Sequence, residues 1–237
     1  MDTVAPLDSS KEILDCFLSG KFKRMDCPQC ENTFLTKVYE MKCFDGGNKL
    51  SVKCAECKRL FTADTGSDAW QNYVILEKQS LGLEYFLDAI EKHQLTRVPF
   101  ARRVGVLDEE GQPLDPACIH LFTFEEPDYR IIYVMERLEH LDEADSAFFT
   151  EHVHEIDWME EAERIKVWGY VAAHYGDELA SDMRKLCKYY REHPKYLNWD
   201  LHGDNLMRQV KDGKIVIMDP FAPKMGDYME EWLYTCW

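Results

Sequence analysis

The chain has 237 residues, of which 46% are hydrophobic and 13% aromatic, so it can bury a sizeable core in one main domain with a small additional module. Its formal net charge of -16 at pH 7 argues against general binding to nucleic acid, because a negative surface repels phosphates. No apolar run approaches the roughly 18 residues of a membrane-spanning helix, and the first 20 residues lack the basic start and apolar centre of a signal peptide. We therefore expect a cytoplasmic protein without a membrane partner.

The first predicted element is a short amphipathic helix. It begins at Ser9 or Ser10, either of which can cap it, and continues through Lys-Glu-Ile-Leu-Asp-Cys-Phe-Leu. It belongs to a lead segment, residues 1–20, that we expect to pack on the next part of the chain.

Two Cys-x-x-Cys pairs come next. Their members are Cys27, Cys30, Cys54 and Cys57. Between the pairs we predict strands over residues 33–41 and 49–53, and four thiolates arranged in this way can close a tetrahedral site around one Zn²⁺. The alternative of two redox-active pairs lacks a surrounding thioredoxin-like βαβ unit. We therefore predict a zinc ribbon over residues 21–62, in a protein whose other cysteines are reduced.

The predicted ribbon differs in charge from the rest of the chain. Residues 21–60 hold nine Lys and Arg against five Asp and Glu, a balance of +4. Four thiolates and one Zn²⁺ contribute -2, which leaves a weakly basic face that suits a protein partner as readily as RNA.

Strands and one clear helix lie beyond the ribbon. The helix is predicted over residues 81–93, with Leu83, Phe86, Leu87 and Ile90 on one face. Runs rich in β-branched and aromatic residues predict strands over 73–78, 98–107, 119–124 and 130–135.

Residues 139–178 are acidic and rich in His and Trp. His152 and His154 are possible metal ligands, but an i, i+2 pair without a third ligand is more typical of a solvated segment. A long helix is predicted from Leu179 to His193, burying Leu179, Met183, Leu186 and Tyr190, and Pro194 ends it.

The strongest chemical pattern lies between Tyr196 and Phe221. Asp200 is followed five residues later by Asn205, and Asp219 ends the apolar run Ile-Val-Ile-Met. Lys211-Asp-Gly-Lys reads as a hairpin turn that folds Asp219 back beside Asn205. Phosphoryl transfer to a hydroxyl requires such a set: Asp200 accepts the hydroxyl proton, and the other two supply oxygen ligands to Mg²⁺ on nucleotide phosphates.

This stretch resembles the catalytic and metal-binding segments of the protein-kinase-like superfamily, whose pattern is His-Arg-Asp, four residues, Asn, and then Asp-Phe-Gly. Asn198-Trp199-Asp200, Asn205 and Asp219-Pro220-Phe221 stand at these positions. The phrase Asp-Leu-His-Gly-Asp-Asn-Leu-Met looks most like the divergent small serine/threonine kinases of phage and bacteria, and next like aminoglycoside-type phosphotransferases. Asn198 and Pro220 depart from the eukaryotic pattern.

The resemblance implies further residues of an ATP site. Lys78 would contact the α- and β-phosphates, and either Glu84 or Glu91 would pair with it. The segment Met135, Glu136 and Leu138 would form the hinge beside the adenine.

The implied fold class is α+β: a minimal protein-kinase-like two-lobe fold with a truncated C-lobe, preceded by the zinc ribbon. The segments are residues 1–20, the ribbon at 21–62, an N-lobe at 63–138 and a C-lobe at 139–237. Because only sixteen residues follow Phe221, a substrate would be held by the ribbon or by residues 139–178.

Three functions are compatible with these observations. The leading hypothesis is an ATP- and Mg²⁺-dependent serine/threonine kinase that acts on a protein partner. A pseudokinase-like module that docks on a partner is the first alternative, and a small-molecule phosphotransferase is the second. Replacement of Asp200 separates an enzyme from a docking module.

Overall fold

A computed structural model describes residues 10–25, 36–41, 49–53, 60–64, 73–78, 81–119, 129–154 and 156–224, with the strands between 22 and 64 described by their backbone alone. The structure is of the α+β class, with helices and antiparallel sheets. Contacts divide the chain into two compact units: residues 1–80, 100–119 and 127–139, and residues 81–99, 120–126 and 140–237. The four segments predicted from the sequence stay a prediction.

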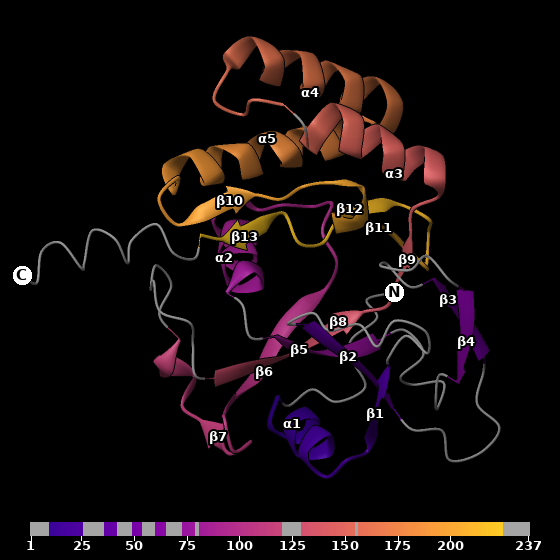
Figure 1. Cartoon of the computed structure of the whole chain (residues 1–237), viewed down its shortest axis with the longest axis vertical. Helices are drawn as coiled ribbons and strands as arrows, with labels where there is room; N and C mark the ends of the chain where they lie inside the picture. The colour runs from indigo at the N-terminus through magenta and orange to yellow at the C-terminus, as the bar shows by residue number, and fades with distance from the viewer. Residues whose placement is uncertain are drawn as a thin grey trace, which may run out of the picture. The chain divides into compact units, whose positions relative to one another are not determined.

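The first unit contains mostly strands (Figure 1). Its elements are α1 (Ser10–Leu18), β1 (Phe22–Met25), β2 (Thr36–Met41), β3 (Lys49–Lys53), β4 (Leu60–Asp64), β5 (Tyr73–Lys78), β6 (Ala101–Asp108), β7 (Pro113–Leu114), η2 (Pro116–Cys118) and β8 (Tyr129–Glu136). β9 (Leu138–His140) stands where the chain passes into the second unit.

Within the described residues, a six-stranded sheet runs in the order β1-β2-β5-β8-β6-β7, and every pairing in it is antiparallel. β8 is central because Ile, Tyr, Val and Met cover both of its faces, so neither face needs water. On one face Ile13 of α1 packs against a cluster of Tyr73, Ile75, Val104, Leu107, Ile132 and Val134. This cluster is the core of the first unit.

The strands predicted for the ribbon pair with other strands. β2 lies between β1 and β5 in the large sheet, and β3 pairs with β4, from Lys49 opposite Asp64 to Lys53 opposite Leu60. The strands predicted over 33–41 and 49–53 are therefore found as β2 and β3, except for residues 33–35, which lie outside the described residues.

The second unit contains most of the helices. Its elements are α2 (Gly82–His93), α3 (Glu143–Phe149), η3 (Thr150–His154), α4 (Glu161–Tyr175), α5 (Asp177–Glu192), β10 (Leu197–Trp199), η4 (Gly203–Asn205), β11 (Leu206–Gln209), β12 (Ile215–Ile217) and β13 (Phe221–Pro223). Helices α3, α4 and α5 lie beside one another, next to the short strands β10 to β13 (Figure 1). Within the described part of the chain, no helix has both the length and the apolar character needed to cross a bilayer.

Helix α5 provides the centre of the second unit. Leu179, Met183 and Leu186 are fully buried, as their spacing predicts. Tyr189 is also fully buried and donates from its hydroxyl to Asp88 of α2 at 2.6 Å, whereas Tyr190 is half-buried. The predicted buried face is thus correct except at its last position, where contact with α2 buries Tyr189 in place of Tyr190.

The other predicted elements can be compared directly. The helices at Ser10 and at 81–93 are found as α1 and α2, and the strands at 73–78 and 130–135 as β5 and β8. The strand predicted over 98–107 begins later, at Ala101. The strand predicted over 119–124 lies almost wholly outside the described residues.

Candidate functional site

The hairpin predicted between Asn205 and Asp219 is present. β11 pairs with β12 in antiparallel register, with Leu206 opposite Ile217. The main-chain N–H of Met218 donates to the carbonyl of Asn205 at 3.0 Å, which closes the open end of the hairpin. Asn205 and Asp219 therefore lie next to each other, because Asn205 precedes β11, Asp219 follows β12 and the two strands are paired.

A second pairing brings Asp200 to the same place. β10 pairs with β13, with Trp199 opposite Phe221, and the N–H of Asp200 donates to the carbonyl of Pro220 at 3.0 Å. Asp200 directly follows one of these strands and Asp219 lies just before the other. Two antiparallel pairs thus gather side chains that are up to 19 positions apart in the sequence.

Asn205 is oriented by Asp200. Its Nδ2 donates to the carbonyl oxygen of Asp200 at 2.6 Å and lies 3.4 Å from the carboxylate Oδ2. An amide has its donors on nitrogen and its acceptor on oxygen, so this contact leaves Oδ1 of Asn205 to accept from, or coordinate, another group.

The Asp200 carboxyl is half-buried, and its pKa lies above the usual value of an aspartate. Burial is the largest cause, since it disfavours the charged form, and the neighbouring Asp219 charge acts in the same direction. His202, His154 and the hydrogen bond from Asn205 oppose the rise. A carboxylate with a raised pKa holds a proton more readily, which suits a general base.

Two histidines stand beside Asp200. Nε2 of His202 lies 3.9 Å from Oδ1 of Asp200 and 3.1 Å from Nδ2 of Asn205. The ring of His154, the last residue of the π-helical turn η3, meets the ring of His202 edge to face, with centroids 5.5 Å apart. His202 was not among the predicted site residues, and His154 was considered only as a metal ligand and set aside.

The segment α3–η3 is fastened to the loop that carries Asp200. The N–H of Gly203 donates to Oγ1 of Thr150 at 3.3 Å, and that hydroxyl donates to the carbonyl of Ser146 at 3.0 Å. A Cβ at Gly203 would come within 2.7 Å of the Ser146 carbonyl carbon, so only glycine fits this approach. Arg208 of β11 also forms an ion pair with Asp145 of α3.

The start of α2 lies against Asp219. A Cβ at Gly82 would be 2.6 Å from the carbonyl oxygen of Phe221 and 3.4 Å from Oδ1 of Asp219. The missing side chain lets the segment 219–223 approach the first turn of the helix, where unpaired N–H groups favour a negative charge.

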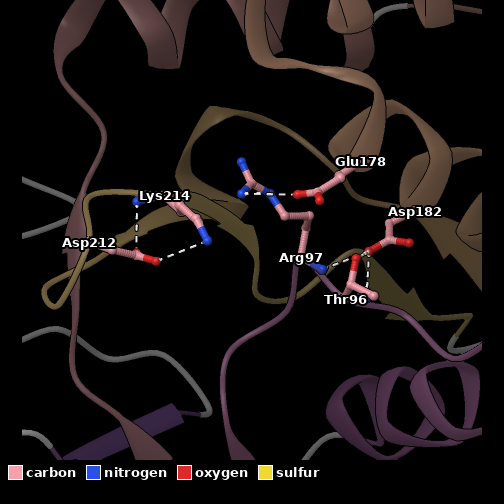
Figure 2. A network of polar contacts seen from close by, with 6 residues as sticks. All are labelled: Thr96, Arg97, Glu178, Asp182, Asp212 and Lys214. Atoms are coloured by element: carbon pink, nitrogen blue, oxygen red, sulfur yellow. Dashed lines mark hydrogen bonds and ion pairs between the residues drawn. The ribbon is translucent and has the colours of Figure 1, made fainter. Parts of the chain in front are cut away.

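A buried carboxylate positions the strand that leads to Asp219 (Figure 2). Asp182 of α5, 1% exposed, accepts through Oδ2 from the N–H groups of Thr96 and Arg97, both at 2.6 Å, and from the Thr96 hydroxyl at 3.1 Å. The carbonyl of Arg97 then accepts from the N–H of Ile217 in β12 at 2.9 Å. The loop after α2 is therefore bonded on one side to α5 and on the other to the β11–β12 hairpin.

The residues predicted to contact nucleotide from the first unit lie on the large sheet. Lys78 of β5 stands opposite Ile131 of β8, and Val74 opposite Met135, so Lys78 and Met135 are on one face, away from α1. Both are buried, at 4% and 3% exposure. Glu136 is buried and donates its N–H to the carbonyl of Phe100, and Leu138 is half-buried.

The remaining predicted residues divide between the second unit and the ribbon. Glu91 is exposed on α2 and Glu84 half-buried in its first turn, and both belong to the second unit, whereas Lys78 belongs to the first. The predicted zinc ligands Cys27, Cys30, Cys54 and Cys57 lie outside the described residues. Among the described residues, no group of three or more His, Cys, Asp or Glu side chains is arranged to hold a metal ion.

That finding does not conflict with a nucleotide-bound Mg²⁺, which takes one or two protein oxygens and completes its octahedron with phosphate and water. Oδ1 of Asn205 and the carboxylate of Asp219 fit this requirement.

Searches of the chain against protein-family models and curated proteins find no match.

Sequence reasoning missed His202, His154, Gly82 and Gly203. His202 lies within the recognised phrase, two residues after Asp200, so its position was available as a signal. The contacts of the other three depend on segments at least 48 positions away, from Ser146 and Thr150 to Gly203, from His154 to His202 and from Gly82 to Phe221. No local pattern reports such contacts.

Proposed function

We propose that this protein is an ATP- and Mg²⁺-dependent phosphotransferase of minimal protein-kinase-like fold, and that it phosphorylates Ser or Thr hydroxyls of a protein partner. The observation that carries the proposal is the convergence of Asp200, Asn205 and Asp219 at the ends of two antiparallel strand pairs. An Asx-rich turn alone would account for the bond from Asn205 to the Asp200 carbonyl, but not for the two strand pairs that bring Asp219 beside Asp200.

Each of the three side chains has a distinct role. Asp200 accepts the proton of the acceptor hydroxyl as its oxygen attacks the γ-phosphorus, and the bond from that phosphorus to the β-phosphate oxygen breaks to release ADP. Oδ1 of Asn205 and the carboxylate of Asp219 would hold Mg²⁺, which would neutralise charge on the phosphates. The raised pKa of Asp200 improves its capacity to take the proton.

Lys78 and the segment Met135, Glu136 and Leu138 contribute the nucleotide contacts in this proposal. Lys78 and Met135 lie on the same face of the sheet formed by β5 and β8, so both are placed to contact one nucleotide. The pairing of Lys78 with Glu84 or Glu91 stays a prediction from the resemblance.

The partner docks through residues 139–178 in this proposal. Segment α3–η3 falls within that range and is bonded to the Asp200 loop through Thr150 and Gly203. This proximity favours the 139–178 surface over the ribbon as the site that presents an acceptor hydroxyl. The ribbon, with its four cysteines and Zn²⁺, is then a second docking element.

The test compares Asp200→Asn, Asp219→Ala and the wild type with γ-labelled ATP, Mg²⁺ and a lysate. Asp200→Asn keeps shape but loses proton acceptance, so transfer should fall roughly 10²-fold or more while nucleotide affinity changes little. Asp219→Ala should abolish the Mg²⁺-dependent rise in melting temperature with ATP. Asp212→Asn, the same change in the exposed hairpin turn, is the matched control.

Wild-type protein that gives neither labelling nor a Mg²⁺-dependent thermal shift would refute the proposal. Nucleotide binding with transfer that survives Asp200→Asn would favour the docking module instead. Labelling of an aminoglycoside but of no protein would favour the small-molecule phosphotransferase.

A further inference from the structure

We propose that His154 is a positioning residue of the Asp200 site, and that it acts by packing against His202 and thereby fixing the amide of Asn205. The inference rests on the proposed function, since its consequence is measured in phosphotransfer. It adds a residue from an acidic segment that carries no part of the catalytic pattern.

The hydrogen bonds of His202 do not by themselves fix its ring. The N–H of Asp204 points at Nδ1 from 3.3 Å, and Nδ2 of Asn205 lies 3.1 Å from Nε2. A neutral imidazole has one acceptor nitrogen, so it can accept only one of these two donors at a time. A change of tautomer would exchange one contact for the other, and a flip of the ring would put carbon atoms at both places, so only one arrangement accepts from the Asn205 amide.

His154 supplies the missing constraint. Its ring meets the His202 ring at 84° with centroids 5.5 Å apart, which is the edge-to-face geometry that aromatic rings favour. This contact limits rotation of His202 without using either of its nitrogens. The ring of His202 is therefore held between a packing contact and the Asn205 amide.

The position of His154 is fixed although its side chain is exposed. Its neighbour Val153 and Phe149 one turn earlier are both fully buried, and they anchor the segment. Thr150 accepts from the Gly203 N–H, and the Asp145–Arg208 ion pair ties α3 to β11. The π-helical turn places His154 at the end of this anchored segment, and such turns often mark functional sites.

His152 provides a matched control. It lies on the same turn and is also exposed, but its ring contacts Phe148 and Tyr170, with centroids 4.9 and 5.7 Å away. Removing His152 deletes an equivalent ring without touching His202. A difference between the two alanine variants therefore reports the contact with His202 and not the general stability of η3.

The first measurement does not depend on activity. Ring ¹H–¹³C spectra of protein labelled at its eight histidines should show the His202 signal displaced in His154→Ala and unchanged in His152→Ala. The signal is assigned from its loss in His202→Gln. An unmoved His202 signal in His154→Ala would overturn the inference whether or not the protein is an enzyme.

The second measurement is kinetic. In His154→Ala, kcat should fall and the Mg²⁺ concentration for half-maximal rate should rise, each roughly tenfold, as for other residues that orient a metal ligand. His154→Phe, which keeps the ring contact, should restore both values to within about twofold of the wild type, and His152→Ala should match the wild type.

The outcomes separate the two proposals. An active wild type with His154→Ala equal to His152→Ala, or with no rescue by Phe, would overturn the positioning role alone. An inactive wild type that also binds no nucleotide would overturn the proposed function and this inference with it, even if the histidine contact is confirmed by the spectra.

Discussion

Replacing Asp182 tests whether the loop after α2 holds the β11–β12 hairpin in place. The Asp182 side chain is 1% exposed. One carboxylate oxygen accepts from the main-chain N–H groups of Thr96 and Arg97 and from the Thr96 hydroxyl, and the other oxygen accepts from Nζ of Lys185 at 3.0 Å. Asp182→Ala removes the acceptor of the Thr96 and Arg97 donors, whereas Lys185 keeps its contact with the carbonyl of Gln94 at 3.3 Å. Asp182→Asn keeps one oxygen for the main-chain groups but removes the charge.

The contacts set the size of the effect. A hydrogen bond to a charged group contributes about 1.5–3 kcal/mol, and a donor left unsatisfied costs about 1–3 kcal/mol. Since neighbouring contacts do not add fully, we expect Asp182→Ala to lower the free energy of unfolding by about 4 kcal/mol and Asp182→Asn by about 1.5 kcal/mol. For a chain of this size, a loss of about 4 kcal/mol lowers Tm by roughly 8–16 °C.

The assay is urea unfolding at pH 7, with Glu178→Gln as the control. Glu178 lies one turn earlier on α5 and pairs with Arg97 of the same loop at 3.7 Å, but its side chain is 75% exposed (Figure 2). An exposed pair of this kind contributes less than about 1 kcal/mol. The order of destabilisation should therefore be Asp182→Ala, then Asp182→Asn, then Glu178→Gln.

The same carboxyl predicts a dependence on pH. Burial opposes its ionisation, but the N–H groups of Arg97 and Thr96, together with Lys185, lower the pKa of Asp182 below the usual value. A group whose pKa is lower in the folded state stabilises the fold above its unfolded pKa of about 4, and that contribution disappears as the pH falls through the folded pKa. The difference between wild type and Asp182→Asn should thus shrink below about pH 4.

Two results would refute this reasoning. One is an Asp182→Ala variant no less stable than Glu178→Gln. The other is a destabilised Asp182→Ala variant that retains the full Mg²⁺-dependent response to nucleotide, because the position of β12 and Asp219 would then not depend on the Thr96–Arg97 loop.

The remaining predictions concern a close approach and a metal. Gly203→Ala should destabilise the protein by about 2 kcal/mol in the same urea assay and reduce phosphoryl transfer, because the new methyl group meets the Ser146 carbonyl. The control Gly169→Ala has open space around it in α4 and should stabilise the protein by up to about 1 kcal/mol. Metal analysis should find one zinc per chain, reduced in Cys54→Ser, and a wild-type stoichiometry well below one would contradict the ribbon.

The sequence determined the local part of the site. Asn205 and Asp219 flank one hairpin, and the alternation of its strands with a polar turn is enough to predict that its ends meet. Helical periodicity also predicted most of the buried residues of α2 and α5, because the apolar pattern of a helix repeats every three to four residues and is visible locally. Where periodicity failed, at Tyr189, a hydrogen bond to another helix decided which aromatic ring was buried.

Only the tertiary structure decided which distant segments support that site. His154 lies in a segment that the sequence predicts to be solvated, and Asp182 lies on a helix whose periodicity predicts only its apolar face. Their contacts with His202 and with the Thr96–Arg97 loop are visible only in the structure. Such contacts depend on how whole elements pack, and packing is selected by the fit of many side chains at once. The pairing of β2 with β5 is of the same kind, because a strand's pattern specifies its faces but not its neighbour.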